Sequence, residues 1–423
     1  MTWQPPPRPD WVRAVNSGDV PPIADVAKLP LDRDGLLDEA RAELAIDGRG
    51  VEGFADSGLG DDGFLEPLSV LLPALEEEAQ LTVLGRWITR RFLLRLLEVR
   101  AQTVAYVRDD PGVRDEVIDE PVIVTGAPRT GTTILHALLA QDPTSRVPEG
   151  WELLRPVPPP DPATFPDEAR VALADRELRM PALATGTLDA IHEYGGRMHK
   201  ECVSSMSFEF RSEEFTARYH VPSYARWLGS CDMAPAYEWH RLVLQILQRR
   251  FTGTRWVLKS PVHLHSLATL FAVYPDARLA VTHRDPLAVL GSVTSLVATM
   301  RWAHSDEVDF ADIGRYHADL YSGALDRLVD LTESGALDGA HVHHTHYAEF
   351  MADPLVTVTA VADGLGTPVT NETEQAMRAY LDAHPQGAHG EHQYSFDDLH
   401  VDPDDMRARF SRYQSSFDVL REV

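Results

Sequence analysis

The chain has 423 residues, of which 65 are acidic and 39 are lysine or arginine, and its formal net charge at pH 7 is −26. A charge of this size and sign disfavours nucleic acid and anionic membranes as partners, because both are negatively charged themselves. The only two cysteines, Cys202 and Cys231, exclude a disulfide framework. The length suits one elaborate domain or a domain with an extension.

The N-terminal region predicts helices. Apolar residues recur at helical spacing in residues 32–46 and 67–108, and residues 81–107 mix apolar residues with arginine. This mixture suggests an amphipathic helix that packs on the core, forms a homodimer face or covers a substrate pocket. The Pro-rich start lacks the apolar stretch of a signal peptide, and no apolar run approaches the roughly 18 residues of a membrane span. We therefore expect a cytoplasmic protein without an integral membrane segment.

The most informative segment is PVIVTGAPRTGTTILHALL, residues 121–139. Its apolar start predicts a buried strand, and the apolar-periodic stretch after Thr133 predicts a helix. The first N–H groups of a helix have no partner within it, and the helix dipole favours negative charge there. Arg129 adds a positive charge, and the threonines add hydroxyl donors. The segment predicts a cradle for a phosphate-like group, with an ordinary strand-to-helix turn as the alternative.

The loop departs from the nucleotide-triphosphate loop GxxxxGK[ST] at one telling position. Residues 126–133 read GAPRTGTT, so that Thr132 stands where the other loop has its lysine. A kinase or ATPase with this sequence would lack the charge that reaches the β- and γ-phosphates. The cation stands earlier, at Arg129, which suits a single terminal 5′-phosphate-type group better than a magnesium-bound triphosphate.

Residues 255–296 predict a strand–helix–strand–helix unit, which is the unit of a parallel sheet. The two predicted strands, at 256–258 and 279–281, are followed closely by Lys259 and Arg284. Both cations thus fall at the carboxyl ends of strands, where open α/β sheets bind ligands.

Lysine is rare in this chain. It occurs only at positions 28, 200 and 259, and arginine supplies all the other strongly basic residues. An ordinary surface cation in such a composition is an arginine, so Lys259 suggests a need for a compact ammonium group. A plain surface lysine is the alternative.

The two segments together resemble the PAPS-dependent sulfotransferases (PAPS is 3′-phosphoadenosine 5′-phosphosulfate), and more narrowly the bacterial branch with a PRTGTT or PRSGTT loop. The resemblance implies a P-loop-like α/β fold of three layers, in which helices flank a central parallel sheet. It implies that the loop binds the 5′-phosphosulfate. Ile134 stands where family members carry a Trp that stacks on the adenine. The loop residues that match the family are Arg129, Thr130, Gly131, Thr132 and Thr133.

The same resemblance implies the other nucleotide contacts. The family binds the 3′-phosphate with an Arg at a strand end and a Ser eight residues later, and Arg284 and Ser292 match that spacing. Tyr347 opens a segment similar to the family's YEDMxxDP, whose Tyr approaches the adenine. Gly387 and Gly390 match the GxxG skeleton of the C-terminal loop that closes over the nucleotide, without its basic pair.

Catalytic roles are implied as well. Lys259 matches the family lysine that reaches the bridging oxygen of the donor, and no metal is implied. The base that takes the proton of the acceptor hydroxyl is open among several residues, each of which has a solvated or helix-capping role as its alternative. The candidates, in order of preference, are Glu152, then Glu149 and His263, and in reserve His199 and Glu201.

Residues 167–250 predict a helical insertion, which a stiff Pro-rich linker at 156–166 separates from the first strand–helix unit. Its many aromatic residues most often belong to a core. A pocket for a small hydrophobic acceptor, such as a lipid, sterol or aromatic alcohol, would also be built here, because the other half is assigned to the nucleotide. We divide the chain into a helical extension, 1–115, and an α/β domain, 116–423, that carries this insertion.

Three functions remain open. The first is transfer of a sulfuryl group from PAPS to the hydroxyl of a small acceptor. The second is a P-loop phosphotransferase (kinase), against which Thr132 argues, and the third is a nucleotide-binding homologue that is catalytically silent. Lys259 and the nearby Glu and His residues favour the active enzyme. Four histidines between 341 and 346 lie on a predicted strand, but no second His pair or cysteine completes a metal site.

Overall fold

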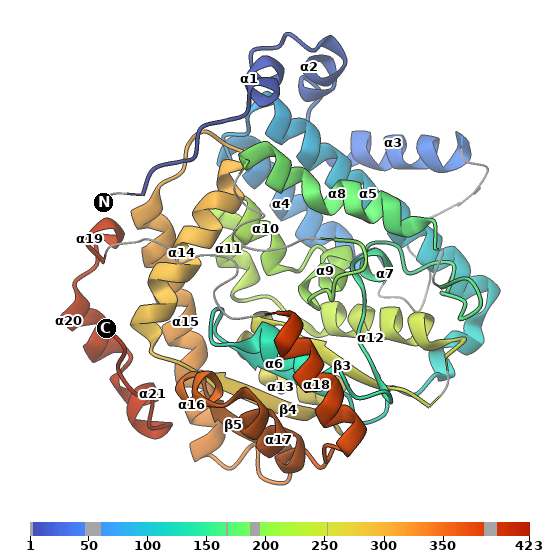
Figure 1. The fold of residues 1–423 in the computed structure, drawn as a ribbon. Helices are drawn as coiled ribbons and strands as arrows, with labels where there is room; N and C mark the ends of the chain where they lie inside the picture. The colour runs from blue at the N-terminus through green and yellow to red at the C-terminus, as the bar shows by residue number, and fades with distance from the viewer. Residues whose placement is uncertain (1–2, 47–60, 166–167, 187–194, 252, 385–395) are drawn as a thin grey trace.

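A computed structural model describes residues 3–46, 61–165, 168–186, 195–251, 253–384 and 396–423. At its centre lies a five-stranded parallel sheet with the strand order β2-β3-β1-β4-β5 (Figure 1). The strands are β1 (Val122–Gly126), β2 (Ser145–Arg146), β3 (Arg255–Lys259), β4 (Arg278–His283) and β5 (His341–His346). The sequence predicted all of them except β2, a two-residue edge strand without an apolar run.

Helices cover both faces of the sheet, because successive side chains of each strand point to opposite faces. On one face, Val124, Val257 and their neighbours pack against α6, α17 and α18. On the other face, Ile123 and Leu258 belong to the main core, which includes residues of α12 to α15. The predicted three-layer α/β fold is confirmed. The helices next to the strands are α6 (Thr132–Leu139), α13 (Leu267–Val273), α14 (Pro286–Trp302), α15 (Phe310–Glu333), α16 (Tyr347–Ala352), α17 (Pro354–Gly364) and α18 (Asn371–Ala383).

The main core includes residues of the N-terminal helices α3, α4 and α5, whereas Val12 and Val15 of α1 belong to a separate, smaller cluster. The longest of them, α5, is more deeply buried than the predicted amphipathic helix, because its inward arginines find partners. Arg100 is fully buried, pairs with Glu209, and stacks on the rings of Phe64 and Trp239 at 4.2 and 4.4 Å. These helices are α1 (Asp10–Asn16), α2 (Pro21–Ala27), α3 (Arg33–Ile46), α4 (Leu65–Glu77) and α5 (Val83–Asp109), with the short 3-10 helices η1 (Asp61–Phe64) and η2 (Pro111–Asp115).

The predicted insertion is helical, and its aromatic residues form core. Phe208, Phe210, Phe215, Tyr224 and Tyr237 have no exposed surface. The elements between β2 and β3 are α7 (Gly150–Leu154), α8 (Arg170–Thr185), α9 (Val203–Met206), η5 (Ser207–Glu209), α10 (Glu213–Arg218), α11 (Pro222–Leu228) and α12 (Ala234–Gln248).

The C-terminal segment returns to the edge of the sheet at β5 through α19 (Phe396–Leu399), α20 (Pro403–Arg409) and α21 (Ser411–Ser416) (Figure 1, red). His283 joins this edge to α21: its Nε2 lies 2.8 Å from His344 Nδ1, and its Nδ1 lies 2.9 Å from the Tyr413 hydroxyl. Among the described residues no helix is long and apolar enough to cross a membrane. The same residues hold no group of three or more side chains arranged to bind a metal ion.

Candidate active site

The PRTGTT loop lies at the carboxyl edge of the sheet, between β1 and α6. Gly126 lets β1 run close to β4, because a Cβ atom on this residue would lie 2.3 Å from Thr282 Oγ1. Gly131 caps α6 with a φ of +88°, a left-handed conformation that glycine adopts without strain. The loop therefore turns sharply and points the first N–H groups of α6 toward the open edge of the sheet.

The side chains of the loop divide into two groups. Thr130 and Thr132 are buried, and the Thr130 hydroxyl donates to the Ala127 carbonyl at 2.7 Å, so that it braces the loop from within. Arg129 and Thr133 are exposed and face outward from the same turn. These two side chains, together with the amides, are the groups that the loop offers to a ligand.

Lys259 ends β3 and reaches the start of α6. Its ammonium nitrogen lies 3.4 Å from Thr133 Oγ1 and 2.5 Å from Glu201 Oε1. Glu201 is held there by its own backbone neighbour, since the Cys202 N–H donates to the Lys259 carbonyl at 3.2 Å. We name Lys259, Thr133 and Glu201 the transfer cluster. It combines a cation, a hydroxyl and a carboxylate beside a helix N-terminus.

Arg284 follows β4 and forms a second group beside the loop. Its guanidinium lies 3.9 Å above the ring of Tyr347, and its Nη1 donates to the Arg129 carbonyl at 2.7 Å. The Arg129 side chain in turn donates from Nε to the Ser292 hydroxyl at 3.1 Å. Tyr347 packs on the loop so closely that a Cβ atom on Gly131 would lie 3.3 Å from its ring. We name Arg129, Arg284, Ser292 and Tyr347 the arginine cluster.

The two preferred carboxylates, Glu149 and Glu152, form a capping box at the start of α7. Glu152 has no exposed surface, accepts from the Glu149 N–H at 2.9 Å, and pairs with Arg146 of β2 at 2.6 Å. Burial raises the pKa of Glu152, and Arg146 opposes that shift. Glu149 pairs with Arg197 at 2.9 Å and accepts from the Trp151 indole at 2.6 Å. Both carboxylates are committed to local structure.

Glu152→Ala is expected to destabilise the fold by about 3–5 kcal/mol, because it leaves the charge of Arg146 buried without a carboxylate partner. Chemical denaturation of the variant measures the loss. Glu149→Ala serves as its control and should cost less, since Glu149 is 19% exposed and its partner Arg197 is 35% exposed. Equal losses of stability in the two variants would show that the Arg146–Glu152 pair contributes no more to the free energy of unfolding than the Glu149–Arg197 pair.

His263, the other alternate base, is fully buried in η6 (Pro261–His265). Its Nδ1 lies 2.9 Å from the Tyr237 hydroxyl, and burial lowers its pKa to about 4, so that the ring is neutral near pH 7. His199 is exposed and lies beside the ring of His136 at 5.4 Å. Of the five base candidates, Glu201 is the one whose carboxylate contacts Lys259.

The structure brings together most of the residues that the sequence predicted to contact a nucleotide. The loop, Lys259, Arg284, Ser292 and Tyr347 gather at one edge of the sheet, whereas Gly387 and Gly390 lie outside the described residues. One member of the site had no sequence signal. Glu422 pairs with Arg284 at 2.8 Å although 138 residues separate them, and no local pattern marks such a contact.

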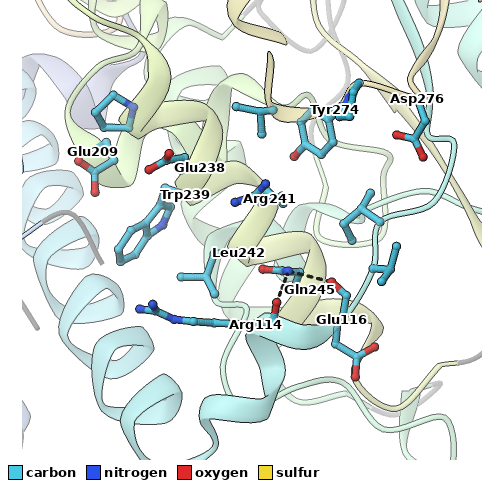
Figure 2. Close-up of a pocket in the computed structure, with 15 residues that line it drawn as sticks. Arg114, Glu116, Glu209, Glu238, Trp239, Arg241, Leu242, Gln245, Tyr274 and Asp276 are labelled. Carbon is cyan, nitrogen blue, oxygen red and sulfur yellow. Dashed lines mark hydrogen bonds between the residues drawn. The ribbon is translucent and has the colours of Figure 1, made fainter. Parts of the chain in front are cut away.

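A cavity of about 570 Å³ lies at the amino ends of the strands, on the opposite side of the sheet from the loop (Figure 2). Its lining includes residues that precede β1 (Glu116) and β4 (Asp276), and residues of α12 such as Trp239. Gln245 spans part of it and donates to the Arg114 and Glu116 carbonyls at 3.0 and 2.8 Å. Because it opens at the amino ends of the strands, this cavity is separate from the loop and its two clusters.

Comparison with known proteins identifies the family. The family model "Sulfotransferase family" matches residues 121–371, which is more than half of the chain. The chain belongs to the sulfotransferase family. Over 279 residues it is 25% identical to omega-hydroxy-beta-dihydromenaquinone-9 sulfotransferase Stf3 of Mycobacterium bovis. The aligned region covers 63% of this chain and 68% of the relative.

Two solved structures resemble this sulfotransferase over nearly their whole length. Sulfotransferase STF1 from Mycobacterium tuberculosis H37Rv is 31% identical with a TM-score of 0.77, covering 90% of this chain and 98% of the other. Sulfotransferase STF9 from Mycobacterium avium is 27% identical with a TM-score of 0.81, covering 93% and 99%. The likeness therefore extends well beyond residues 121–371 of this sulfotransferase.

Proposed function

We propose that this sulfotransferase moves a sulfuryl group from PAPS to a hydroxyl of a small, lipid-like acceptor. The observation that carries the proposal is the transfer cluster, in which Lys259 and Glu201 meet Thr133 at the start of α6. It brings a cation and a carboxylate to the mouth of an anion-binding loop. Sulfuryl transfer to an alcohol needs both, one for the leaving oxygen and one for the proton of the alcohol.

The residues present fit PAPS at both of its anionic ends. The amides of the loop and Arg129 suit the 5′-phosphosulfate, and Arg284 with Ser292 suits the 3′-phosphate. A stand-in for the second group is already there, because the Glu422 carboxylate accepts from Nε and Nη2 of Arg284 at 2.8–3.1 Å. An Arg that binds a carboxylate in this two-pronged way is equally suited to phosphate.

When bound, PAPS supplies the sulfuryl group, and its transfer places negative charge on the oxygen that bridges sulfur and phosphorus. The chain's own residues then have separate tasks. Lys259 stabilises the bridging oxygen, and Arg129 with the loop amides holds the 5′ end in place. Glu201 takes the proton of the acceptor hydroxyl. We propose Glu201 for this role ahead of Glu152, because the Glu152 carboxylate is fully buried against Arg146.

The acceptor class rests on the relatives and on the insertion side of the molecule. The curated relative is named for a lipid alcohol, an omega-hydroxylated menaquinone derivative. On the insertion side a cavity of about 500 Å³ is lined by apolar residues such as Met206 and Leu228, by Val262 and Leu264 of η6, and by charged residues such as Glu213 and Arg327. η6 begins two residues after Lys259. These features support an acceptor with an apolar body and a hydroxyl group.

A thermal shift experiment tests the donor. Adenosine 3′,5′-bisphosphate should raise the melting temperature, since a ligand at a hundredfold excess over its dissociation constant stabilises the native state by about 2.7 kcal/mol. Magnesium–ATP should not, because Thr132 replaces the lysine of a triphosphate loop. A shift with magnesium–ATP alone would favour the phosphotransferase. Binding without turnover of any acceptor would favour the silent homologue.

Arg284→Ala is expected to weaken binding of the bisphosphate by about 10- to 100-fold, the loss for a charged hydrogen-bond partner of 1.5–3 kcal/mol. Adenosine 5′-monophosphate should bind the variant and the parent within a few-fold of each other. Isothermal titration of both nucleotides measures the two effects. Equal weakening of the monophosphate would remove Arg284 from the 3′ position.

A further inference from the structure

The C-terminal segment places a carboxylate in the fork of Arg284. Glu422 accepts from Arg284 Nε at 3.0 Å through Oε1, and from Nη2 at 2.8 Å through Oε2. The opposite edge of the guanidinium faces the loop, where Nη1 donates to the Arg129 carbonyl. The side that Glu422 fills is therefore the side that a 3′-phosphate would need.

Asp285 fixes the backbone of the same segment. It has no exposed surface, and its Oδ2 accepts from the N–H groups of Glu422 and Val423 at 2.7 and 3.3 Å. Arg407 of α20 donates to the same carboxylate at 2.8 Å and also to the Val423 carbonyl. Asp285 caps α14 and follows Arg284 directly in the sequence. Its hydrogen bonds therefore hold the last two residues beside the proposed 3′-phosphate site.

The base of the segment is anchored separately. Phe417 stacks on the ring of His283 with centroids 4.6 Å apart, and Tyr413 contacts the same histidine. Burial holds the pKa of His283 well below its usual value, so this contact is between neutral groups. The attachment of α21 to the sheet therefore does not depend on the contact between Glu422 and Arg284.

We propose that Glu422 is an autoinhibitory residue, which occupies the proposed 3′-phosphate site until a 3′-phosphorylated nucleotide displaces it. The inference rests on the proposed function. A phosphate carries more charge and more acceptor oxygens than the carboxylate, so it competes successfully for Arg284. A nucleotide without this phosphate gains nothing from the exchange and binds with Glu422 still in place. Glu422 therefore lowers the affinity for the full nucleotide without touching its 5′ end.

Glu422→Gln tests the proposal, with Glu374→Gln as the matched control because Glu374 forms an exposed pair with Arg378 at 2.6 Å. Isothermal titration of Glu422→Gln should show about three- to tenfold tighter binding of adenosine 3′,5′-bisphosphate, as expected for loss of a partly exposed ion pair that competes with the ligand. Adenosine 5′-monophosphate should bind unchanged. An unchanged bisphosphate affinity, or an equal change for both nucleotides, overturns the proposal.

Hydrogen exchange separates this proposal from the proposed function. In the free protein, Glu422→Gln should raise exchange in peptides that cover residues 417–423, and the bisphosphate should do the same in the parent protein. If the parent binds neither nucleotide, the proposed function fails while the first comparison still tests the contact. If the parent binds the bisphosphate through Arg284 and exchange is insensitive to Glu422→Gln, the inhibitory role of Glu422 alone is wrong.

Discussion

Lys259→Ala is expected to lower kcat by about 10²–10³-fold, which is the usual cost of removing one donor that stabilises the charge of a transition state. Lys259 is 5% exposed and contacts Thr133 at the start of α6, so that neither solvent nor another cation takes its place. Steady-state assays with PAPS and titration of the bisphosphate measure catalysis and binding separately. Nucleotide affinity should stay within a few-fold of the parent.

The scarcity of lysine provides a matched control for this experiment. Lys28 follows α2, is exposed and pairs with Asp25 of that helix at 2.9 Å, so Lys28→Ala should leave kcat unchanged. A Lys259→Ala variant that folds like the parent and keeps its activity would mean that the bridging oxygen is stabilised elsewhere. A loss confined to nucleotide affinity would make Lys259 a binding residue instead.

Glu201→Gln is expected to lower kcat by about 10²–10⁴-fold, the range that general base catalysis contributes. The substitution preserves the shape of the side chain but removes its basicity. Glu201 is 28% exposed, so the variant should fold. The measurement is again kcat with PAPS and an alcohol acceptor, accompanied by a melting curve.

Glu177→Gln controls for loss of a partly exposed ion pair, because Glu177 is 32% exposed and pairs with Arg155 at 2.5 Å. Its activity should equal that of the parent. The result that would reverse the assignment is an active Glu201→Gln together with a folded but inactive Glu152→Gln. In that case the base is the carboxylate favoured by resemblance rather than the one favoured by geometry.

Local chemistry explains what the sequence predicted. The apolar runs of β1, β3 and β4 and the glycines of the loop determine backbone shape within a few residues, so the sheet and the sharp turn of the loop could be predicted. The edge strand β2 was not, because its two residues have no apolar pattern. This omission affected the choice of the base, because β2 carries Arg146, which forms a buried ion pair with Glu152.

Contacts between distant parts of the chain account for the rest. Glu201 meets Lys259 across 58 residues, and Glu422 meets Arg284 across 138 residues. Such pairs depend on the path of the whole chain, and a side chain that takes part in them looks like any surface glutamate in the sequence. Position in the fold raised Glu201 from a reserve candidate to the proposed base.

The register of β1 and β4 has a consequence for how the enzyme selects a donor. These neighbouring strands pair Gly126 with Thr282, and the PRTGTT loop and Arg284 extend from their ends. Backbone hydrogen bonds fix the spacing of adjacent strands, so the distance between the loop and Arg284 is the least adjustable dimension of the proposed site. Because Ile134 stands where family members carry a stacking Trp, we expect selectivity to depend mainly on the distance between the two phosphates of the nucleotide. The identity of the base should matter less.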